Sequence, residues 1–224
     1  MIHGLTFKEY IEEEKEKIGE MTKAEKKSYF IDYYLKYCIA AVVILGLLVW
    51  IGIDFGRAMR HTIVTGGVIG AHLSEEGTTY LTDDYMTYLD KSTFSNKIDF
   101  ASYIILDDED YQTYTVFQAE LAVNRYNYLI TTKKGLAFVA QCECLADLDP
   151  ILDDELKQKV SDKIFRAKLG ESGAMIAAAV DISDTAFAKD YLIAGEPVYF
   201  IITGQTDDYE SGLDVLRYIL RKES

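Results

Sequence analysis

The organisation of the chain is decided by one apolar stretch, Tyr37-Cys38-Ile39-Ala40-Ala41-Val42-Val43-Ile44-Leu45-Gly46-Leu47-Leu48-Val49-Trp50-Ile51-Gly52-Ile53. None of its side chains is charged. At ~1.5 Å per residue, a helix of this length measures about 25 Å, near the lower limit for crossing a bilayer core. Aromatic residues lie at both ends, as expected at the two headgroup levels. The stretch therefore predicts a transmembrane helix, with residues 37–53 in contact with the lipid bilayer.

Two other interpretations of this stretch are a buried core helix and a cleaved signal peptide. A core helix that is apolar on every side requires a much larger protein around it. A signal peptide would have an n-region of 36 residues, and no small-residue cleavage site follows, because the run ends in Ile53-Asp54-Phe55-Gly56-Arg57. An uncleaved signal-anchor fits the sequence better.

Basic residues on the two sides of the stretch predict its orientation. They are Lys23, Lys26, Lys27 and Lys36 before it, and Arg57 and Arg60 after it. The excess on the N-terminal side predicts a cytoplasmic N-terminus in the cell membrane. We therefore expect a cytoplasmic helical segment at 1–36, a transmembrane helix at 37–57 and an extracytoplasmic domain at 58–224.

The C-terminal part carries most of the negative charge. The chain has 224 residues and a formal net charge of -14, and residues 58–224 hold 28 of its 37 acidic and 15 of its 23 basic side chains. An acidic surface argues against nucleic acid as a partner. A segment of this length is sufficient for one domain with a hydrophobic core.

Cysteine and histidine are too sparse to predict a metal site. Cys142 and Cys144 form a C-x-C pair, and His3, His61 and His72 are the only histidines. A C-x-C disulfide is possible but strained, so we expect two structural thiols beside a helix end. The acidic run at 107–110 lacks the spacing and the glycine of an EF-hand loop. We predict neither a metal nor a cofactor.

Beyond the apolar stretch, the hydrophobic periodicity alternates between strands and helices. Strands are predicted at 62–70, 98–106, 126–132, 174–182 and 197–203, and helices at 82–91, 107–125, 133–141, 153–168 and 207–222. Upstream, a helix is expected at 6–20, and Thr22 with Glu25 has the form of a capping box that opens a helix running into the membrane. This order predicts an α/β domain with a largely parallel sheet.

Catalytic motifs are missing from the sequence. It contains no P-loop, no G-x-G-x-x-G and no G-x-S-x-G, and Gly66-Gly67-x-x-Gly70 falls within a predicted strand. We therefore expect that the protein is not an enzyme.

Several short segments resemble known proteins. They are Leu129–Thr132, Phe138–Gln141, Leu145–Leu152, Asp181–Ser183 and Pro197–Ile202. Together they resemble bacterial extracytoplasmic solute-binding proteins, in which a strand, a short helix and a leucine-x-aspartate-leucine turn precede the next helix. The N-terminal segments Phe7–Glu12, Met21–Lys23 and Tyr29–Tyr34 are similar to uncharacterised single-pass membrane proteins of clostridial-type Firmicutes. Cys144 stands where those solute-binding proteins often have glycine, and the domain is shorter than a two-lobed receptor.

The resemblance implies a periplasmic-binding-protein type 2-like sheet that binds its ligand between lobes. Independently, ligands of open α/β sheets bind at the carboxyl ends of the strands. The polar residues expected there are His72, Ser74, Asp107, Asp108, Thr131, Lys133, Thr203 and Gln205. They are candidate ligand-binding residues, and the alternative is that they are ordinary polar loop residues.

Two functions follow from this interpretation. The first is a membrane-anchored, solute-binding-like module that binds a small solute or peptide outside the cell. The second is a structural or interaction subunit of a membrane complex, which contacts other membrane proteins and uses the fold without a small ligand.

Overall fold

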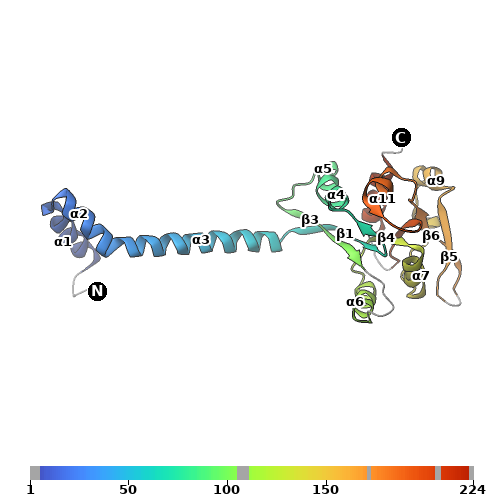
Figure 1. Cartoon of the computed structure of the whole chain (residues 1–224), viewed down its shortest axis with the longest axis horizontal. Helices are drawn as coiled ribbons and strands as arrows, with labels where there is room; N and C mark the ends of the chain where they lie inside the picture. The colour runs from blue at the N-terminus through green and yellow to red at the C-terminus, as the bar shows by residue number, and fades with distance from the viewer. Residues whose placement is uncertain (1–5, 105–110, 171–172, 205–207, 222–224) are drawn as a thin grey trace. The chain divides into compact units, whose positions relative to one another are not determined.

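The computed structural model of the chain describes residues 6–104, 111–170, 173–204 and 208–221 (Figure 1). The chain divides into two compact units, Met1–Met59 and Arg60–Ser224. The division lies two residues after the predicted end of the transmembrane helix at 57.

Two capped helices begin the N-terminal unit. Helix α1 spans Phe7–Glu20 and α2 spans Lys23–Tyr29. The Thr22 hydroxyl accepts from the backbone N–H of Glu25, and the Glu25 carboxylate accepts from the backbone N–H of Thr22 at 2.8 Å. This arrangement is the capping box that the sequence predicts, and it satisfies two N–H groups that a helix end otherwise leaves without partners.

The helix that α2 begins continues through a π-helical turn, η1 at Phe30–Tyr34, into α3 at Leu35–Ala58. The continuous helix from Lys23 to Ala58 is long and apolar enough to cross a membrane, with a mean hydropathy of 2.5 in its most apolar window and none of that window buried. A helix of the length of α3 measures about 36 Å. The prediction of one helix of membrane-spanning length and composition is confirmed.

A six-stranded sheet forms the centre of the C-terminal unit, with the strand order β3-β1-β4-β8-β6-β5. The strands are β1 His61–Ile69, β3 Asn96–Ile104, β4 Tyr128–Thr132, β5 Ile164–Lys168, β6 Met175–Asp181 and β8 Val198–Ile202. β1 pairs in parallel with both β3 and β4, whereas the pairs β4–β8, β8–β6 and β6–β5 are antiparallel. Four strands therefore run in one direction, and β8 and β5 run in the other.

Helices cover both faces of this sheet (Figure 1). They are α4 Glu75–Thr79, η2 Tyr80–Asp84, α5 Tyr85–Tyr88, α6 Tyr111–Ala122, α7 Lys133–Gln141, α8 Leu148–Ile151, α9 Asp154–Val160, α10 Ala186–Tyr191 and α11 Tyr209–Leu220. A short second sheet pairs β2, His72–Leu73, with β7, Leu192–Ile193. The result is an α/β domain with three layers, which confirms the predicted fold class in its coarse form. The sheet itself is mixed.

Alternate strand residues divide the core into two clusters. Tyr128 and Ile130 of β4 join one cluster with α5 and α11, while Leu129 between them joins the other cluster with α6 and α7. All three are fully buried. The period of two residues places successive side chains on opposite faces of the sheet, so a strand covered on both faces is apolar throughout.

The predicted helix at 153–168 is wrong in its second half. Helix α9 ends at Val160, and strand β5 begins at Ile164. β5 forms an antiparallel ladder with β6, in which Ile164 lies opposite Val180. Backbone pairing and the burial of Ile164 and Phe165 against the core therefore override the helical preference of the charged residues around them.

The predicted helix at 82–91 begins earlier than expected. Its N-cap is Ser74, whose hydroxyl accepts from the Gly77 N–H at 3.0 Å. Thr82, which the sequence indicated as the cap, lies inside the helix, where its hydroxyl donates to the carbonyl of Thr78 at 2.8 Å. A threonine hydroxyl bonded to the carbonyl four residues earlier no longer competes with the helix, so Thr82 is tolerated there.

Candidate functional site

Two predicted site residues lie at the short second sheet: His72 belongs to strand β2, and Ser74 directly follows that strand. His72 is exposed and pairs with Ile193 of β7. Ser74 is the cap of α4 and donates its backbone N–H to the Tyr191 carbonyl at 2.9 Å. The described contacts of Ser74 are those of a structural residue.

Thr131 lies at the carboxyl end of β4 but has no access to solvent. Gly135 of α7 packs so closely on it that an added Cβ at position 135 would collide with the Thr131 hydroxyl. Lys133, two residues later, is exposed at the start of α7. The carboxyl end of β4 is therefore filled on this face by the first turn of α7.

Thr203 lies at the opposite end of the sheet from Thr131, so the prediction that both share one edge is wrong. Its hydroxyl donates to the carbonyl of Tyr126, which precedes β4. The reason is the direction of β8: because β8 is antiparallel to β4, its carboxyl end meets the amino end of β4. The predictions for Asp107, Asp108 and Gln205 fall outside the described residues.

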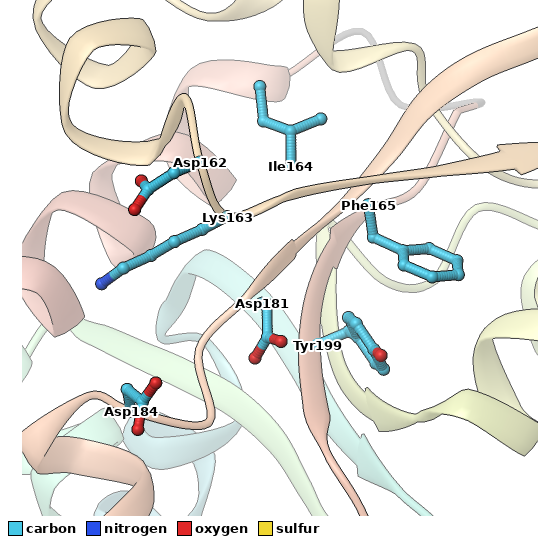
Figure 2. A pocket seen from close by; sticks show the side chains of 7 residues that line it. All are labelled: Asp162, Lys163, Ile164, Phe165, Asp181, Asp184 and Tyr199. Carbon is cyan, nitrogen blue, oxygen red and sulfur yellow. The ribbon is translucent and has the colours of Figure 1, made fainter.

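A polar pocket of about 330 Å³ opens instead beside the carboxyl end of β6 (Figure 2). Its lining residues are Asp162, Lys163, Ile164, Phe165, Asp181, Asp184 and Tyr199. They come from the start of β5, the end of β6 with the turn after it, and the start of β8. The pocket lies wholly within the C-terminal unit.

The register of the sheet fixes the centre of this pocket. Tyr199 of β8 lies opposite Asp181 of β6 on one side and opposite Thr131 of β4 on the other. The Asp181 N–H donates to the carbonyl of Lys163 at 2.8 Å, which fixes the start of β5 on the far side of β6. Three successive strands therefore place Lys163, Asp181 and Tyr199 in one row.

The turn after β6 holds the Asp181 carboxylate in place. This carboxylate accepts from the backbone N–H of Ser183 at 2.9 Å and from the Ser183 hydroxyl at 2.6 Å. The same hydroxyl accepts from the Val198 N–H at 2.9 Å, which ties the turn to the start of β8. The Asp181 carboxylate is therefore held by the backbone and hydroxyl of Ser183, and Ser183 is itself held by the backbone of Val198.

Tyr199 gives the pocket an aromatic wall. Its ring lies 5.1 Å from that of Phe165, at an interplanar angle of 52°. Only 7% of the residue is exposed. Burial, followed by the charges of Asp181 and Glu196, raises the pKa of the Tyr199 phenol, so the group is neutral at physiological pH.

The other charged groups of the pocket make it acidic. Asp162 and Asp184 are exposed, and Asp184 pairs with Lys189 of α10 at 3.5 Å. The lining holds three aspartates and one lysine, Lys163. Figure 2 shows these side chains around the opening, with the Asp181 carboxylate beside the Tyr199 ring.

The functional groups of the pocket are three carboxylates, one amine and two aromatic rings. Cysteine, serine and histidine are not among its lining residues. In the part of the chain that the structure describes, no three His, Cys, Asp or Glu side chains are grouped closely enough to hold a metal ion. The pocket offers carboxylates and aromatic rings, which recognise polar and cationic groups.

The N-terminal unit contains a different kind of pocket. It measures about 380 Å³, and its lining, which is mostly apolar, consists of Ile18, Lys26, Tyr29, Phe30 and Tyr34. Beside it, the Glu14 carboxylate accepts hydrogen bonds from the hydroxyls of Tyr29 and Tyr34 at 2.8 and 2.9 Å. These two bonds connect α1 to the helix that continues toward the apolar stretch.

Neither Cys142 nor Cys144 forms a disulfide. Cys144 is buried, and its Sγ donates to the carbonyl of Cys142 at 3.2 Å. Burial raises the pKa of both thiols, which lowers the thiolate fraction and with it their reactivity. This agrees with two structural thiols at the end of α7 and not with a C-x-C disulfide.

Sequence reasoning did not include the residues of the acidic pocket among its candidates. One signal was present: Asp181 directly follows an apolar strand, as ligand-binding residues of α/β sheets often do. For Tyr199 there was no such signal, because an aromatic residue inside a predicted strand is normally part of the core. Only the pairing of β6 with β8 brings the two together.

Fold and pocket together define a chain with one apolar helix of membrane-spanning length and one three-layer α/β unit with an acidic pocket. No family model, curated protein or solved structure matches the chain. The resemblance to solute-binding proteins and to clostridial-type membrane proteins therefore stays a prediction.

Proposed function

We propose that the protein is a membrane-anchored, non-enzymatic binding module that holds an α/β domain at the outer face of the cell membrane. The observation that carries this proposal is the acidic pocket, whose central groups come from three neighbouring strands. The ligand is a small solute or a peptide side chain, since a volume of about 330 Å³ is at the lower end of typical ligand sites.

The anchor in this proposal is the helix that continues from Lys23 to Ala58. The exposed surface of residues 37–53, the uncharged part of this helix, suits lipid, because a helix that is apolar all round is stable only inside a large protein or a membrane. The four lysines within residues 23–36 outnumber the two arginines within residues 57–60, which supports a cytoplasmic N-terminus. A C-terminal alkaline phosphatase fusion tests the orientation: activity in intact cells is expected, and an inactive but stably expressed fusion contradicts it.

We also propose that the α/β unit is a shortened form of the periplasmic-binding-protein type 2 fold. The supporting observation is the order β4, α7, turn, α8, which matches the strand, short helix and turn that the resemblance implies. Residues after Arg60 form one compact unit. In this proposal the ligand therefore binds at the edge of a single sheet.

Thermal unfolding of the full chain in lipid nanodiscs tests ligand binding. Amino acids, sugars and short peptides are screened for stabilisation, and a ligand at about 100 times its Kd adds about 2.7 kcal/mol. Asp162→Asn, which changes an exposed pocket residue, is expected to weaken binding of any hit. Asp190→Asn, an equal charge change on α10 outside the pocket lining, is the control. A broad screen without any stabilising compound contradicts the proposal.

A second candidate function is an interaction subunit without a small ligand. The observation that favours it is the filled carboxyl end of β4, where Thr131 is fully buried below Gly135. When side chains fill the carboxyl end of a strand, where ligands of α/β sheets usually bind, the domain can act as an interaction subunit that binds no small ligand. Crosslinking in native membranes tests it, because a partner should be captured at stoichiometric yield, and recovery of the monomer alone removes its support.

A further inference from the structure

The acidic pocket has an excess of negative charge that its own lysine does not balance. Asp162, Asp181 and Asp184 line it together with Lys163, which gives a formal charge of −3 + 1 = −2 at neutral pH. Asp184 has a partner outside the pocket in Lys189, at 3.5 Å and with both side chains largely exposed. A ligand with positive charge would reduce the mutual repulsion of these carboxylates.

Tyr199 is a second, independent feature that points to a ligand. Only 7% of the residue is exposed, it lines the pocket, and its hydroxyl makes no hydrogen bond to another described residue. The hydroxyl oxygen is not among the fully buried unpartnered atoms of the described residues, so it can be reached from the pocket. A hydroxyl at a pocket wall without a protein partner is available to a ligand. A phenol oxygen accepts from an N–H donor, and the neighbouring carboxylate of Asp181 accepts from the same kind of group.

The aromatic pair adds a third feature. Phe165 and Tyr199 lie 5.1 Å apart with their rings tilted by 52°. The two rings pack against each other and form an aromatic wall beside the Asp181 carboxylate, and a ring face that is open to the pocket attracts ammonium groups. Anionic ligands gain nothing from these rings and are repelled by the aspartates.

A bare metal ion fits the pocket less well than an organic cation. The aspartates come from three separate positions, before β5, at the end of β6 and in the turn after it. They do not form a group of three ligands at metal-binding distances within the part of the chain that is described. Separated carboxylates, one of which lies beside an aromatic pair, suit a larger cation with several N–H donors (Figure 2).

From these features we infer that the pocket binds a small organic amine, with its ammonium group at Asp181 and Tyr199 and its carbon chain against Phe165. This inference rests on the proposed function and specifies the chemical class of the ligand. A free diamine and the lysine side chain of a peptide share this chemistry.

A matched set of five-carbon probes tests the inference on the full chain in nanodiscs. The probes are 1,5-diaminopentane, 1,5-pentanediol and glutarate, which share a chain length and differ in charge, and an N-acetyl-lysine-amide arm represents the peptide source. Thermal unfolding and isothermal titration are measured at constant ionic strength. The expected result is saturable binding of the diamine or of the lysine amide, and no binding of the diol or of glutarate.

Three variants separate the pocket from general attraction between an amine and an acidic protein. Tyr199→Phe is expected to raise the Kd of the diamine by roughly tenfold, the effect of a lost charge-assisted contact. Asp162→Asn removes one of the three lining carboxylates and is expected to raise the Kd as well, through the weaker negative charge of the pocket. Asp190→Asn removes the same charge elsewhere and should leave the Kd unchanged. Asp162 is exposed, and its side chain makes no hydrogen bond to another described residue, so its variant is expected to remain folded.

Two results of these measurements would overturn the inference of an amine ligand. Diamine binding that does not saturate, or that Asp162→Asn and Asp190→Asn weaken equally, overturns the inference, because the amine then acts as a counterion only. A different result is saturable binding of glutarate or of the diol, weakened by Tyr199→Phe. This result overturns the inference of an amine ligand but supports the proposed binding function. Absence of binding both here and in the broad ligand screen contradicts the proposed function as well.

Discussion

Gly66 of β1 lies directly against the ring of Tyr128 on β4. A Cβ added at position 66 would lie 2.5 Å from both the Cε1 and the hydroxyl oxygen of Tyr128, and closer still to its Cζ. The two residues are also partners in the parallel β1–β4 ladder. The glycine is thus required by the close approach of a large, fully buried side chain from the neighbouring strand.

Gly66→Ala is therefore expected to destabilise the C-terminal unit by about 1–3 kcal/mol, because overpacking in a closely packed core forces side chains or backbone to move. Urea unfolding of the full chain in detergent, followed by the near-ultraviolet circular dichroism of the tyrosines, measures this loss. Gly195→Ala is the control, since nothing lies within 4 Å of its added Cβ. Equal stability of the two variants would show that Tyr128 can move away at little cost.

Tyr128→Phe is expected to have the opposite effect. The Tyr128 hydroxyl is buried and has no hydrogen-bond partner among the described residues. Burying an unpartnered hydroxyl costs about 1–3 kcal/mol, so its removal should leave stability unchanged or raise it by about 1 kcal/mol.

The matched control for this change is Tyr126→Phe. The Tyr126 hydroxyl donates to the Glu120 carboxylate at 2.6 Å, and losing that bond should cost about 1 kcal/mol. Urea midpoints of both variants give the comparison. A clear loss of stability in Tyr128→Phe would mean that this hydroxyl has a partner, such as a buried water.

Asp153 connects two helices and gives the C-terminal unit an acid-sensitive contact. It caps α9 through the Leu156 N–H at 2.7 Å and accepts from Arg217 of α11 at 2.6 Å. The backbone hydrogen bond, followed by that from Arg217, lowers the pKa of Asp153 below its value in the unfolded chain. Its contribution to stability is thus present above the unfolded pKa of about 4 and is lost as the pH falls through the lower folded value.

Asp153→Asn tests this contact. Asparagine retains the cap but not the charge, so the variant should be less stable than the wild type at pH 6 and approach it at pH 3. Unfolding midpoints measured across this range give the difference. If the difference in unfolding midpoint between the wild type and Asp153→Asn does not change with pH, the effect comes from the helix cap and not from the charge.

Glu14→Ala is expected to loosen the N-terminal unit, because it removes the acceptor for both Tyr29 and Tyr34. Amide hydrogen exchange of α1 in nanodiscs should become faster, and trypsin should cleave sooner after Lys15 and Lys17. Glu13→Ala changes the exposed neighbouring position and serves as the control. Identical exchange in the two variants would show that other contacts hold α1.

These hydrogen bonds also predict a pH effect within the N-terminal unit. They lower the pKa of Glu14, so they stabilise the unit above the ordinary glutamate pKa and are lost as the pH falls through the lowered value. In the wild type, exchange of α1 should therefore rise toward acidic pH. In Glu14→Ala this rise should be smaller.

Much of the order of elements could be predicted from the sequence, because local patterns determine it. The Thr22–Glu25 capping box and the apolar strand that became β6 are examples. The helix predicted at 153–168 failed because β5 is short and charged on alternate positions, and only its ladder with β6 makes it a strand. The hydrophobic pattern of one segment carries no information about its pairing with a strand elsewhere in the chain.

The location of the candidate site could not be predicted from the sequence. Thr203 was expected beside Thr131, but the direction of β8 places it at the other end of the sheet. Asp181 and Tyr199 are 18 positions apart in the chain, and they meet only through the β6–β8 register. Strand direction and register depend on the packing of both sheet faces, which no single segment specifies.

The sequence by itself determined that this chain has one apolar helix of membrane-spanning length and an α/β domain after it, because uninterrupted hydrophobicity and alternating periodicity are local properties. Only the tertiary structure decided where the pocket lies. Antiparallel β8 brings a buried tyrosine opposite an aspartate, and α7 fills the position where a ligand was first expected. The physical reason is that a site is made by side chains from separate strands, whose proximity is fixed by sheet pairing and packing.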